Sequence, residues 1–423
     1  MKFLALLGLS CIVAAQTVLG GGARLLPENG NCVYTNTGLF RSWPASGPRE
    51  LWRLKIGDGK AAVIEADGRA FTAYQENGWQ WAACLEPATG KILWKRPLIE
   101  RENHHHAVGP VTSPIVDNDR VYFIPYDSWQ SNYWYPQCPV FCLRVKDGSE
   151  VWHETTNFFN TEGSTPLIIS NTLYMGSSGK SNIVVAVDKM TGKLLWKTVH
   201  DSGSQYVYQV GASLSYAEFG GIPQVVASIW TNDIIGVSLK DGQVLWKWGF
   251  PTRIASGICG TPVVMGSQLF LSGYQGAVSW GVCLNMVLRD GKITPETNYC
   301  DSKLQCNQFH TVSIVNGAVY GFGKSGQGEA MQCTDFKTGK LIWQQTGPDW
   351  NCKRQLIVAD GLIFATTQHD ELVLAEASKK GWHELGRVNP GIKMGLPQQP
   401  TLGGEGRLYL RGDDTIVCYQ VGK

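Results

Sequence analysis

The chain has 423 residues, of which 43% are hydrophobic and 17% charged, so it can bury a large core and is not broadly disordered. Its 37 basic and 35 acidic side chains leave a formal charge of +2, which gives no electrostatic case for binding nucleic acid or an anionic membrane surface. The 49 glycines and 16 tryptophans are typical of short strands, tight turns and large packing anchors rather than long helices.

The first 20 residues have the pattern of a secretory signal peptide. Lys2 precedes an apolar run over residues 3–15, and small residues follow it. An apolar run of about 13 residues is too short to span a bilayer, which disfavours a transmembrane anchor. We therefore expect a protein that is exported to the periplasm or the extracellular space and has no transmembrane segment.

Residues 21–48 are predicted to be a lead-in segment, and residues 49–423 a single domain. The domain opens with residues 50–54, a strand-like run that carries Trp52 and belongs to no complete repeat. The chain ends after residues 418–421, which have the pattern of a third strand without a fourth. We expect the first run to pair with the last one, because this pairing would close a ring without free edges.

Between these runs the chain repeats one pattern: a small residue, a glycine six residues later and a tryptophan ten residues later. The five complete copies are Cys84/Gly90/Trp94, Cys142/Gly148/Trp152, Ala186/Gly192/Trp196, Gly236/Gly242/Trp246 and Cys333/Gly339/Trp343. Two further copies keep the glycine and lose the tryptophan, at Asn285/Gly291/Pro295 and Ala375/Gly381/Leu385. With an eighth start at Cys418, the copies begin 42 to 58 residues apart, which is the size of a four-stranded propeller blade.

This period predicts an all-β, eight-bladed β-propeller whose last blade is closed by the N-terminal strand. The Asp-Gly or Thr-Gly pairs before the tryptophans are hairpin signals, since glycine adopts a positive φ without steric cost. A large indole needs a neighbour without bulk, so each would pack on the small residue and seal one blade against the next. We therefore predict that six tryptophans are structural: Trp52, Trp94, Trp152, Trp196, Trp246 and Trp343.

Three histidines before the second blade give a weak metal motif. In an extended segment, His104 and His106 share a side and could bind one ion. Two ligands are too few for a site, and no other His-rich motif supplies the rest. A polar loop is the alternative interpretation.

The longest insertion within a blade, residues 126–136, is the first candidate ligand site. It holds Trp129, Tyr133, Trp134 and Tyr135 among amide side chains. Aromatic faces with neighbouring amides favour binding of a carbohydrate or a peptide. Packing of the loop on a neighbouring blade is an equal alternative.

Successive loops of the fourth blade add Tyr206, Trp230, Asn232 and Asp233, which we expect on the same face. A carboxylate beside an indole and an amide could bind a cation or a polar ligand. Asp233 is therefore the best candidate for a catalytic acid, and a turn formed by the Asn-Asp pair is the alternative.

The cysteines do not define a redox or zinc motif. Without Cys11 the count falls from 12 to 11, so at least one thiol is free or pairs between chains. Cys300 with Cys306 and Cys138 with Cys142 are candidate disulfides. The absence of a Cys-x-x-Cys motif disfavours thioredoxin-like chemistry and zinc ribbons.

Residues 186–196, Ala-Val-Asp-Lys-Met-Thr-Gly-Lys-Leu-Leu-Trp, resemble the tryptophan-docking repeat of pyrroloquinoline-quinone (PQQ)-like β-propellers. This family includes quinoprotein alcohol dehydrogenases and an outer-membrane assembly lipoprotein. For the dehydrogenases, the resemblance implies PQQ bound with calcium against a disulfide between adjacent cysteines. No two cysteines are adjacent in this chain, which departs from that pattern.

We expect a non-catalytic ligand- or protein-binding scaffold without a cofactor, because no complete catalytic constellation is visible. The alternative is a quinoprotein oxidoreductase that uses PQQ and calcium to oxidise an alcohol or a sugar. Both a small molecule and a protein stay open as the partner.

Overall fold

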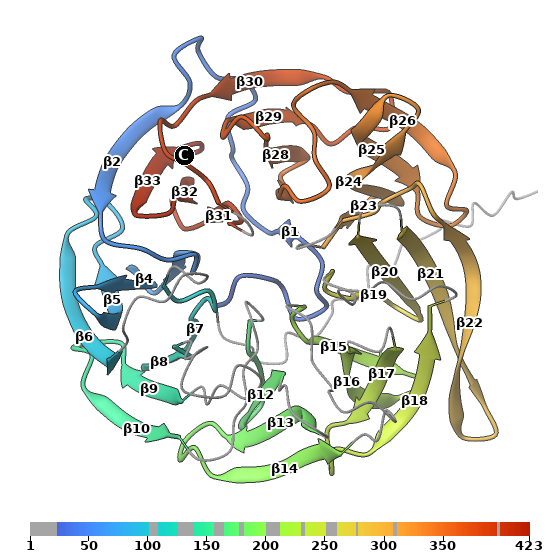
Figure 1. Ribbon diagram of the computed structural model, residues 1–423, viewed down its shortest axis with the longest axis horizontal. Helices are drawn as coiled ribbons and strands as arrows, with labels where there is room; N and C mark the ends of the chain where they lie inside the picture. Colours follow the sequence, from blue (N-terminus) through green and yellow to red (C-terminus); the bar gives the residue numbers. More distant parts are fainter. Residues whose placement is uncertain are drawn as a thin grey trace, which may run out of the picture.

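The computed structural model describes residues 23–100, 109–125, 139–155, 165–176, 182–199, 212–229, 233–250, 260–275, 278–307, 311–395 and 398–423. These residues form eight sheets that surround a central channel, with the outermost strands forming a belt around the ring (Figure 1). The predicted eight-bladed β-propeller is therefore confirmed. None of the described segments forms a helix that could cross a membrane, and the predicted signal peptide lies outside them.

Blades 1 to 6 are antiparallel sheets whose four strands follow chain order from the centre outward. Blades 1 and 2 are β3 (Ile64–Ala66), β4 (Arg69–Glu76), β5 (Trp79–Leu85), β6 (Ile92–Glu100), then β7 (Ile115–Asp117), β8 (Arg120–Phe123), β9 (Val140–Arg144), β10 (Glu150–Glu154). Blades 3 and 4 are β11 (Leu167–Ile169), β12 (Thr172–Gly176), β13 (Asn182–Asp188), β14 (Leu194–Val199), then β15 (Ser215–Phe219), β16 (Ile222–Ile229), β17 (Asp233–Ser238), β18 (Val244–Gly249).

The second half of the ring repeats this order with two additions from the N-terminus. Blades 5 and 6 are β19 (Val263–Met265), β20 (Gln268–Gln275), β21 (Val278–Arg289), β22 (Lys292–Asp301), then β23 (Ser313–Val315), β24 (Ala318–Ser325), β25 (Gly328–Asp335), β26 (Leu341–Thr346). Blade 7 is β27 (Leu356–Ala359), β28 (Leu362–Thr366), β29 (Leu372–Glu376), β30 (Glu384–Val388), with β1 (Val33–Tyr34) parallel to β27. Blade 8 is β31 (Thr401–Leu402), β32 (Arg407–Arg411), β33 (Thr415–Gln420) and β2 (Arg49–Lys55).

The N-terminal strand closes the last blade, as the sequence predicts. β2 pairs antiparallel with β33, and Trp52 lies opposite Cys418. In Figure 1 the blue β2 forms the outer edge of the red blade 8. A buried ion pair also joins blade 8 to blade 1, since Arg407 Nη2 lies 2.7 Å from Glu65 Oε1.

The hydrophobic core is divided among the joints between blades. Eight clusters of buried side chains are present, and each combines residues of two neighbouring blades. Both faces of a sheet are therefore covered. This explains why strands such as β27 are apolar throughout instead of alternating with polar residues.

A tryptophan on the outer strand of one blade bonds to the next blade at five joints. The indole Nε1 donates to the backbone carbonyl of Pro87 from Trp52 (2.8 Å), Val145 from Trp94 (3.0 Å), Lys189 from Trp152 (3.1 Å), Leu239 from Trp196 (3.1 Å) and Ser378 from Trp343 (2.8 Å). Each indole lies opposite the small residue of its repeat, as Cys84 lies opposite Trp94. Trp246 differs, because its indole donates to Gln224 within its own blade.

The sequence predicts the glycine of each repeat in a hairpin turn. The structure shows that it also leaves room for the indole of the preceding blade. A Cβ atom on Gly90 would lie 2.6 Å from Cδ2 of Trp52, which is too close for any side chain. Its φ of +72° also favours glycine. The same close approach recurs where Gly148, Gly192 and Gly242 meet Trp94, Trp152 and Trp196.

The predicted degenerate copy in blade 5 is wrong by several residues. Cys283, not Asn285, occupies the small-residue position, and it lies opposite Tyr299 rather than Pro295. The Tyr299 hydroxyl donates to the Phe336 carbonyl at 3.0 Å and so replaces the missing indole. The error arises because the β21–β22 hairpin is longer than those of the regular blades, which moves the docking residue along the chain.

The predicted copy in blade 7 also fails, because its docking side chain comes from elsewhere. Leu374 lies opposite Gly386, where the regular blades have a tryptophan. Trp43 of the lead-in covers this glycine, and its ring centroid lies 6.1 Å from that of Phe364. The lead-in thus supplies the indole that blade 7 lacks.

Candidate functional site

Two kinds of connection lie on one face of the ring. Because strands alternate in direction, the links between blades and the links from second to third strands emerge together, on what we call the loop face. Nine of the predicted residues lie outside the described residues and stay predictions: His104, His106, Trp129, Tyr133, Trp134, Tyr135, Tyr206, Trp230 and Asn232.

Asp233 is described, and it is the first residue of β17. It pairs with Ile229 on one side and Gly249 on the other, at the end of blade 4 on the loop face. Its carboxylate lies 3.3 Å from Lys247 Nζ, and 15% of its side chain is exposed. The acid is thus held by strand pairing and balanced by a lysine of its own blade, and it could still orient a ligand from the rim of this face.

The lead-in crosses the central channel, which the sequence did not indicate. Residues 23–36, here called the channel bridge, accept backbone N–H bonds from the innermost strands of four blades: Val116 to Ala23 (2.9 Å), Tyr216 to Glu28 (2.7 Å), Val264 to Asn29 (2.8 Å) and Val358 to Cys32 (2.9 Å). The Asn31 side chain adds two 2.8 Å bonds to Ile314 of a fifth blade. Figure 1 shows β1 and the adjoining blue segment at the centre of the ring.

Hydrogen bonds also join two residues within the bridge and connect the bridge to blade 8. The Tyr34 hydroxyl donates to the Leu25 carbonyl at 2.8 Å, and the Asn36 amide donates to Gly403 at 2.7 Å. Its hydrogen bonds therefore extend to six of the eight blades. This arrangement fixes the inner strands relative to one another.

Polar side chains connect neighbouring blades where the inner strands begin. Backbone N–H groups donate to hydroxyls of the next blade from Ala62 to Ser113 (3.0 Å), Thr165 to Ser213 (2.9 Å) and Ser213 to Thr261 (3.0 Å). Hydroxyls donate to carbonyls from Thr311 to Thr261 (2.9 Å) and Thr401 to Val63 (2.7 Å). These buried bonds hold neighbouring blades together at the ends of their inner strands.

The channel bridge carries two charged residues. Arg24 makes one long contact from Nη2 to the Leu214 carbonyl at 3.4 Å, while its Nε and Nη1 atoms are buried without a partner. Burial lowers the pKa of Arg24 to about 10, against the opposing charge of Glu28. Burial likewise raises the pKa of the Glu28 carboxyl. A buried arginine with unpaired N–H groups is suited to binding an anion.

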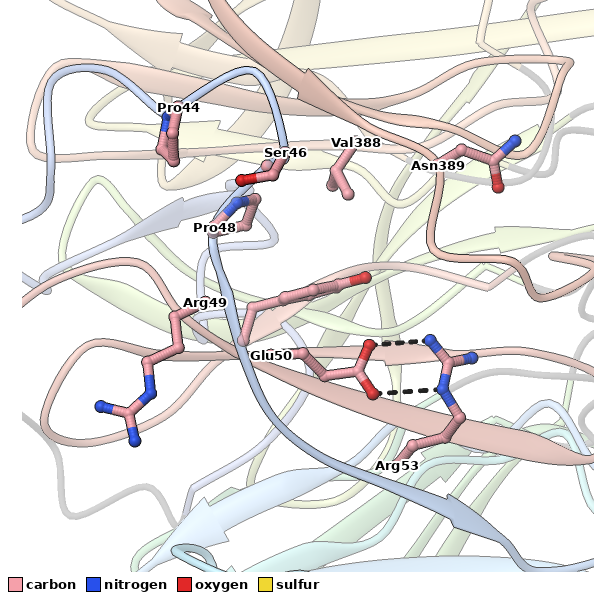
Figure 2. A pocket seen from close by; sticks show the side chains of 10 residues that line it. Pro44, Ser46, Pro48, Arg49, Glu50, Arg53, Val388 and Asn389 are labelled. Carbon is pink, nitrogen blue, oxygen red and sulfur yellow. Dashed lines mark hydrogen bonds and ion pairs between the residues drawn. The ribbon is translucent and has the colours of Figure 1, made fainter.

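A pocket of about 450 Å³ lies on the outer rim between blades 7 and 8 (Figure 2). It is lined by Pro44, Ser46, Gly47, Pro48, Arg49, Glu50, Arg53, Val388, Asn389 and Tyr419. Arg53 and Glu50 point toward each other across it, with Nη2 and Oε2 2.8 Å apart. Arg53 Nη2 also donates to the Pro390 carbonyl, so Arg53 and Glu50 are already paired with groups of the protein.

The nine described cysteines are all free, and burial raises the pKa of each thiol. The free thiols are Cys32, Cys84, Cys142, Cys283, Cys300, Cys306, Cys333, Cys352 and Cys418. The candidate disulfide between Cys300 and Cys306 is therefore not formed, since the buried Cys306 Sγ instead faces the Ser302 carbonyl at 3.7 Å. Cys142 is also unpaired, and Cys138 lies outside the described residues. These protonated thiols are poor nucleophiles and poor metal ligands.

Within the described ranges, no three His, Cys, Asp or Glu side chains are grouped to hold a metal ion. The described residues offer hydrogen-bonded hydroxyls at the joints between blades, a buried guanidinium and a paired carboxylate. Such groups bind and orient polar ligands.

Comparison with known proteins agrees with this architecture. The family model described as outer membrane protein assembly factor BamB matches residues 43–207 and 137–297. BamB from Moraxella catarrhalis has a similar structure, with a TM-score of 0.60 at 13% identity over 88% of this chain and 97% of its own. Quinohemoprotein alcohol dehydrogenase from Comamonas testosteroni gives a TM-score of 0.49 at 11% identity, over 94% of this chain and 80% of its own.

A curated relative with an enzymatic name matches a shorter region. Tetrathionate hydrolase from Acidithiobacillus ferrooxidans is 23% identical over 229 residues, which are 50% of this chain. The match spans 41% of that protein's length. The likeness to solved structures, at these identities, shows the fold alone.

Proposed function

Because the chain belongs to the family described as outer membrane protein assembly factor BamB, we propose that it is a non-catalytic binding scaffold. The proposed scaffold binds a protein or a polar ligand through its loop face. It is proposed to work after export, in the periplasm or outside the cell, as the signal-like residues 1–20 and the relatives' description favour.

The channel bridge is the observation that carries this proposal. It bonds to the innermost strands of five blades and to a turn of a sixth, so the ring is held rigid from inside. The bridge also places the protein's own backbone at the centre of the ring. A rigid ring that presents many connections on one face suits recognition of a partner.

The chemistry of the described residues supports binding more than catalysis. The described thiols have raised pKa values, and Asp233 is paired with Lys247. A catalytic acid or nucleophile commonly needs a pKa shifted toward neutrality. The quinoprotein alternative is retained as an outcome of the test.

The first experiment separates a scaffold from a quinoprotein. Purified protein is titrated with PQQ and Ca²⁺, absorbance is followed, and dye-linked oxidation of alcohols and sugars is assayed. We expect no cofactor-dependent turnover. Saturable PQQ binding with dye reduction would replace the scaffold proposal with the quinoprotein one.

The second experiment tests the loop face. The tagged protein is cross-linked in intact cells that export it, the partner is identified, and the affinity of the purified pair is measured. Trp134→Ala and Asp233→Asn should each weaken binding about tenfold or more if these side chains lie at the centre of the interface. Met190→Ser, in the turn between β13 and β14 on the opposite face, where the residue is 42% exposed, is the control and should not change affinity.

A further inference from the structure

Arg24 lies in the channel with most of its hydrogen-bonding capacity unused. Its Nη2 atom makes a single 3.4 Å contact with the Leu214 carbonyl of blade 4. Its Nε and Nη1 atoms are buried and have no hydrogen-bond partner. A guanidinium has five N–H donors, so nearly the whole cation is without the contacts that burial normally demands.

Other buried arginines in this protein are satisfied in ways that Arg24 is not. Arg407 forms the ion pair with Glu65 and a second one with Glu405. Arg411 donates to the carbonyls of Gly57 at 2.7 Å and Gly59 at 3.2 Å and leaves only its Nη1 atom without a partner. Arg24 has fewer contacts than either, since two of its three nitrogen atoms have no partner and the third makes one long contact.

Glu28 is close enough to influence Arg24 and does not neutralise it by contact. The two charges attract each other, yet no ion pair within 4 Å joins them among the described residues. A buried charge without a contacting counter-charge is costly. A bound anion would remove that cost.

A second polar atom in the same part of the channel also has no partner. The Thr165 hydroxyl is buried without a hydrogen bond, and only 1% of the residue is exposed. Its backbone N–H donates to Ser213 Oγ, and Ser213 precedes Leu214, whose carbonyl Arg24 contacts. A hydroxyl and a guanidinium are both donors that an oxyanion can accept from.

We propose that Arg24 and Thr165 form a binding site for a small oxyanion in the central channel, at the junction of blades 3 and 4. The ligand class is a molecule that carries a carboxylate, sulfate or phosphate group. Arg24 provides the charge and several N–H donors, and Thr165 provides one O–H donor. Because Arg24 belongs to the channel bridge, the anion would also bind the bridge to the wall and stabilise the ring.

The test uses the full-length protein and three probe anions: phosphate, sulfate and citrate. Melting temperature and calorimetric affinity are measured against chloride at equal ionic strength, so that general screening is cancelled. We expect at least one probe to raise the melting temperature in a saturable way. Absence of any saturable effect would overturn the proposal.

Four variants assign the effect to the site. Arg24→Gln and Thr165→Val should weaken anion binding, the former about tenfold or more, since a hydrogen bond to a charged group is lost. Glu28→Gln should tighten binding several-fold, because it removes a nearby negative charge. Arg41→Gln is the matched control, since Arg41 follows in the same lead-in but is exposed and paired with Asp360.

The outcomes are distinguishable from folding defects and from the scaffold proposal. If Arg24→Gln does not fold, Glu28→Gln and Thr165→Val still give shifts in opposite directions. An Arg24→Gln protein that binds the probe like wild type, or an Arg41→Gln protein that loses binding equally, would contradict the site. Trp134→Ala and Asp233→Asn should leave anion binding unchanged, so failure of the loop-face proposal does not decide this one.

Discussion

An indole seals the joints between blades 1 to 4 and the joints around blades 7 and 8. The two regions take these indoles from different parts of the chain. In the first region, Trp94 and Trp152 dock on the glycine and the carbonyl of the blade that follows them in sequence. In the second, Trp43 docks on Gly386 near the other end of the chain, and Trp52 docks on Pro87 and Gly90 of blade 1 from β2, which completes blade 8 by pairing with β33.

The difference concerns connectivity rather than local packing. A joint made by consecutive repeats forms from residues that are close in sequence, and it needs no other part of the ring. The closing joints require the two ends of the chain to meet, which carries a larger loop-closure entropy. Residues 23–55 compensate for this, because they add β1, β2, two indoles and the channel bridge to the ring.

Removing residues 21–56 should lower the stability of the ring more than any other change considered for the two regions. The deletion takes away β2, both closing indoles and the bridge, so blades 7 and 8 lose their seals and an edge is exposed. We expect a fall in melting temperature larger than that of any single tryptophan variant, measured by circular dichroism and calorimetry. A truncated protein that melts like the full-length one would show that the ring does not depend on this closure.

Trp94→Ala and Trp52→Ala compare one joint from each region directly. Both indoles donate to a carbonyl of the next blade, so each substitution should cost about 3–5 kcal/mol in urea unfolding. The costs should be similar, because the local contacts are alike. If Trp52→Ala were nearly neutral while Trp94→Ala was costly, the closure would contribute little to stability.

The fold could be predicted because each blade carries a local signal at a nearly constant period. The closure was also predictable, since an unfinished last copy and an isolated Trp52 strand complete each other. Tyr299 and Trp43 could not be predicted from the repeat. Tyr299 is displaced along the chain by a longer hairpin, and Trp43 lies outside the repeat. Only the folded ring brings these two side chains to the joints between blades.

The candidate site was predictable only as a face. The order of the strands places Asp233 at the loop-face end of β17, but it does not predict the ion pair between Asp233 and Lys247. The channel bridge gave no signal, because its bonds use mainly backbone groups and residues of common type. Arg24 points to a site only once the structure shows that its buried Nε and Nη1 atoms have no hydrogen-bond partner.

Tyr299→Phe should have a smaller effect than the tryptophan variants. It keeps the ring that fills the joint between blades 5 and 6 and removes only the hydroxyl that donates to Phe336. The expected loss is about 1 kcal/mol in urea unfolding, since a net hydrogen bond has this magnitude. Tyr216→Phe is the control, because its exposed hydroxyl makes only a 3.4 Å contact with Glu218 and should cost almost nothing. Equal effects of the two variants would mean that the Tyr299 bond does not seal the joint.

The smallest effect is expected where the two closing indoles are compared as Trp43→Phe and Trp52→Phe. Both substitutions leave an aromatic ring and a modest void, so their packing losses should be similar. Trp52→Phe also removes the bond to Pro87, whereas the buried Nε1 of Trp43 has no hydrogen-bond partner to lose. Removing an unpaired buried N–H even recovers part of the loss. Trp43→Phe should therefore be the milder of the two by about 1 kcal/mol, measured by urea unfolding of both proteins. If Trp43→Phe were the more damaging variant, Trp43 would have a role beyond filling the space above Gly386.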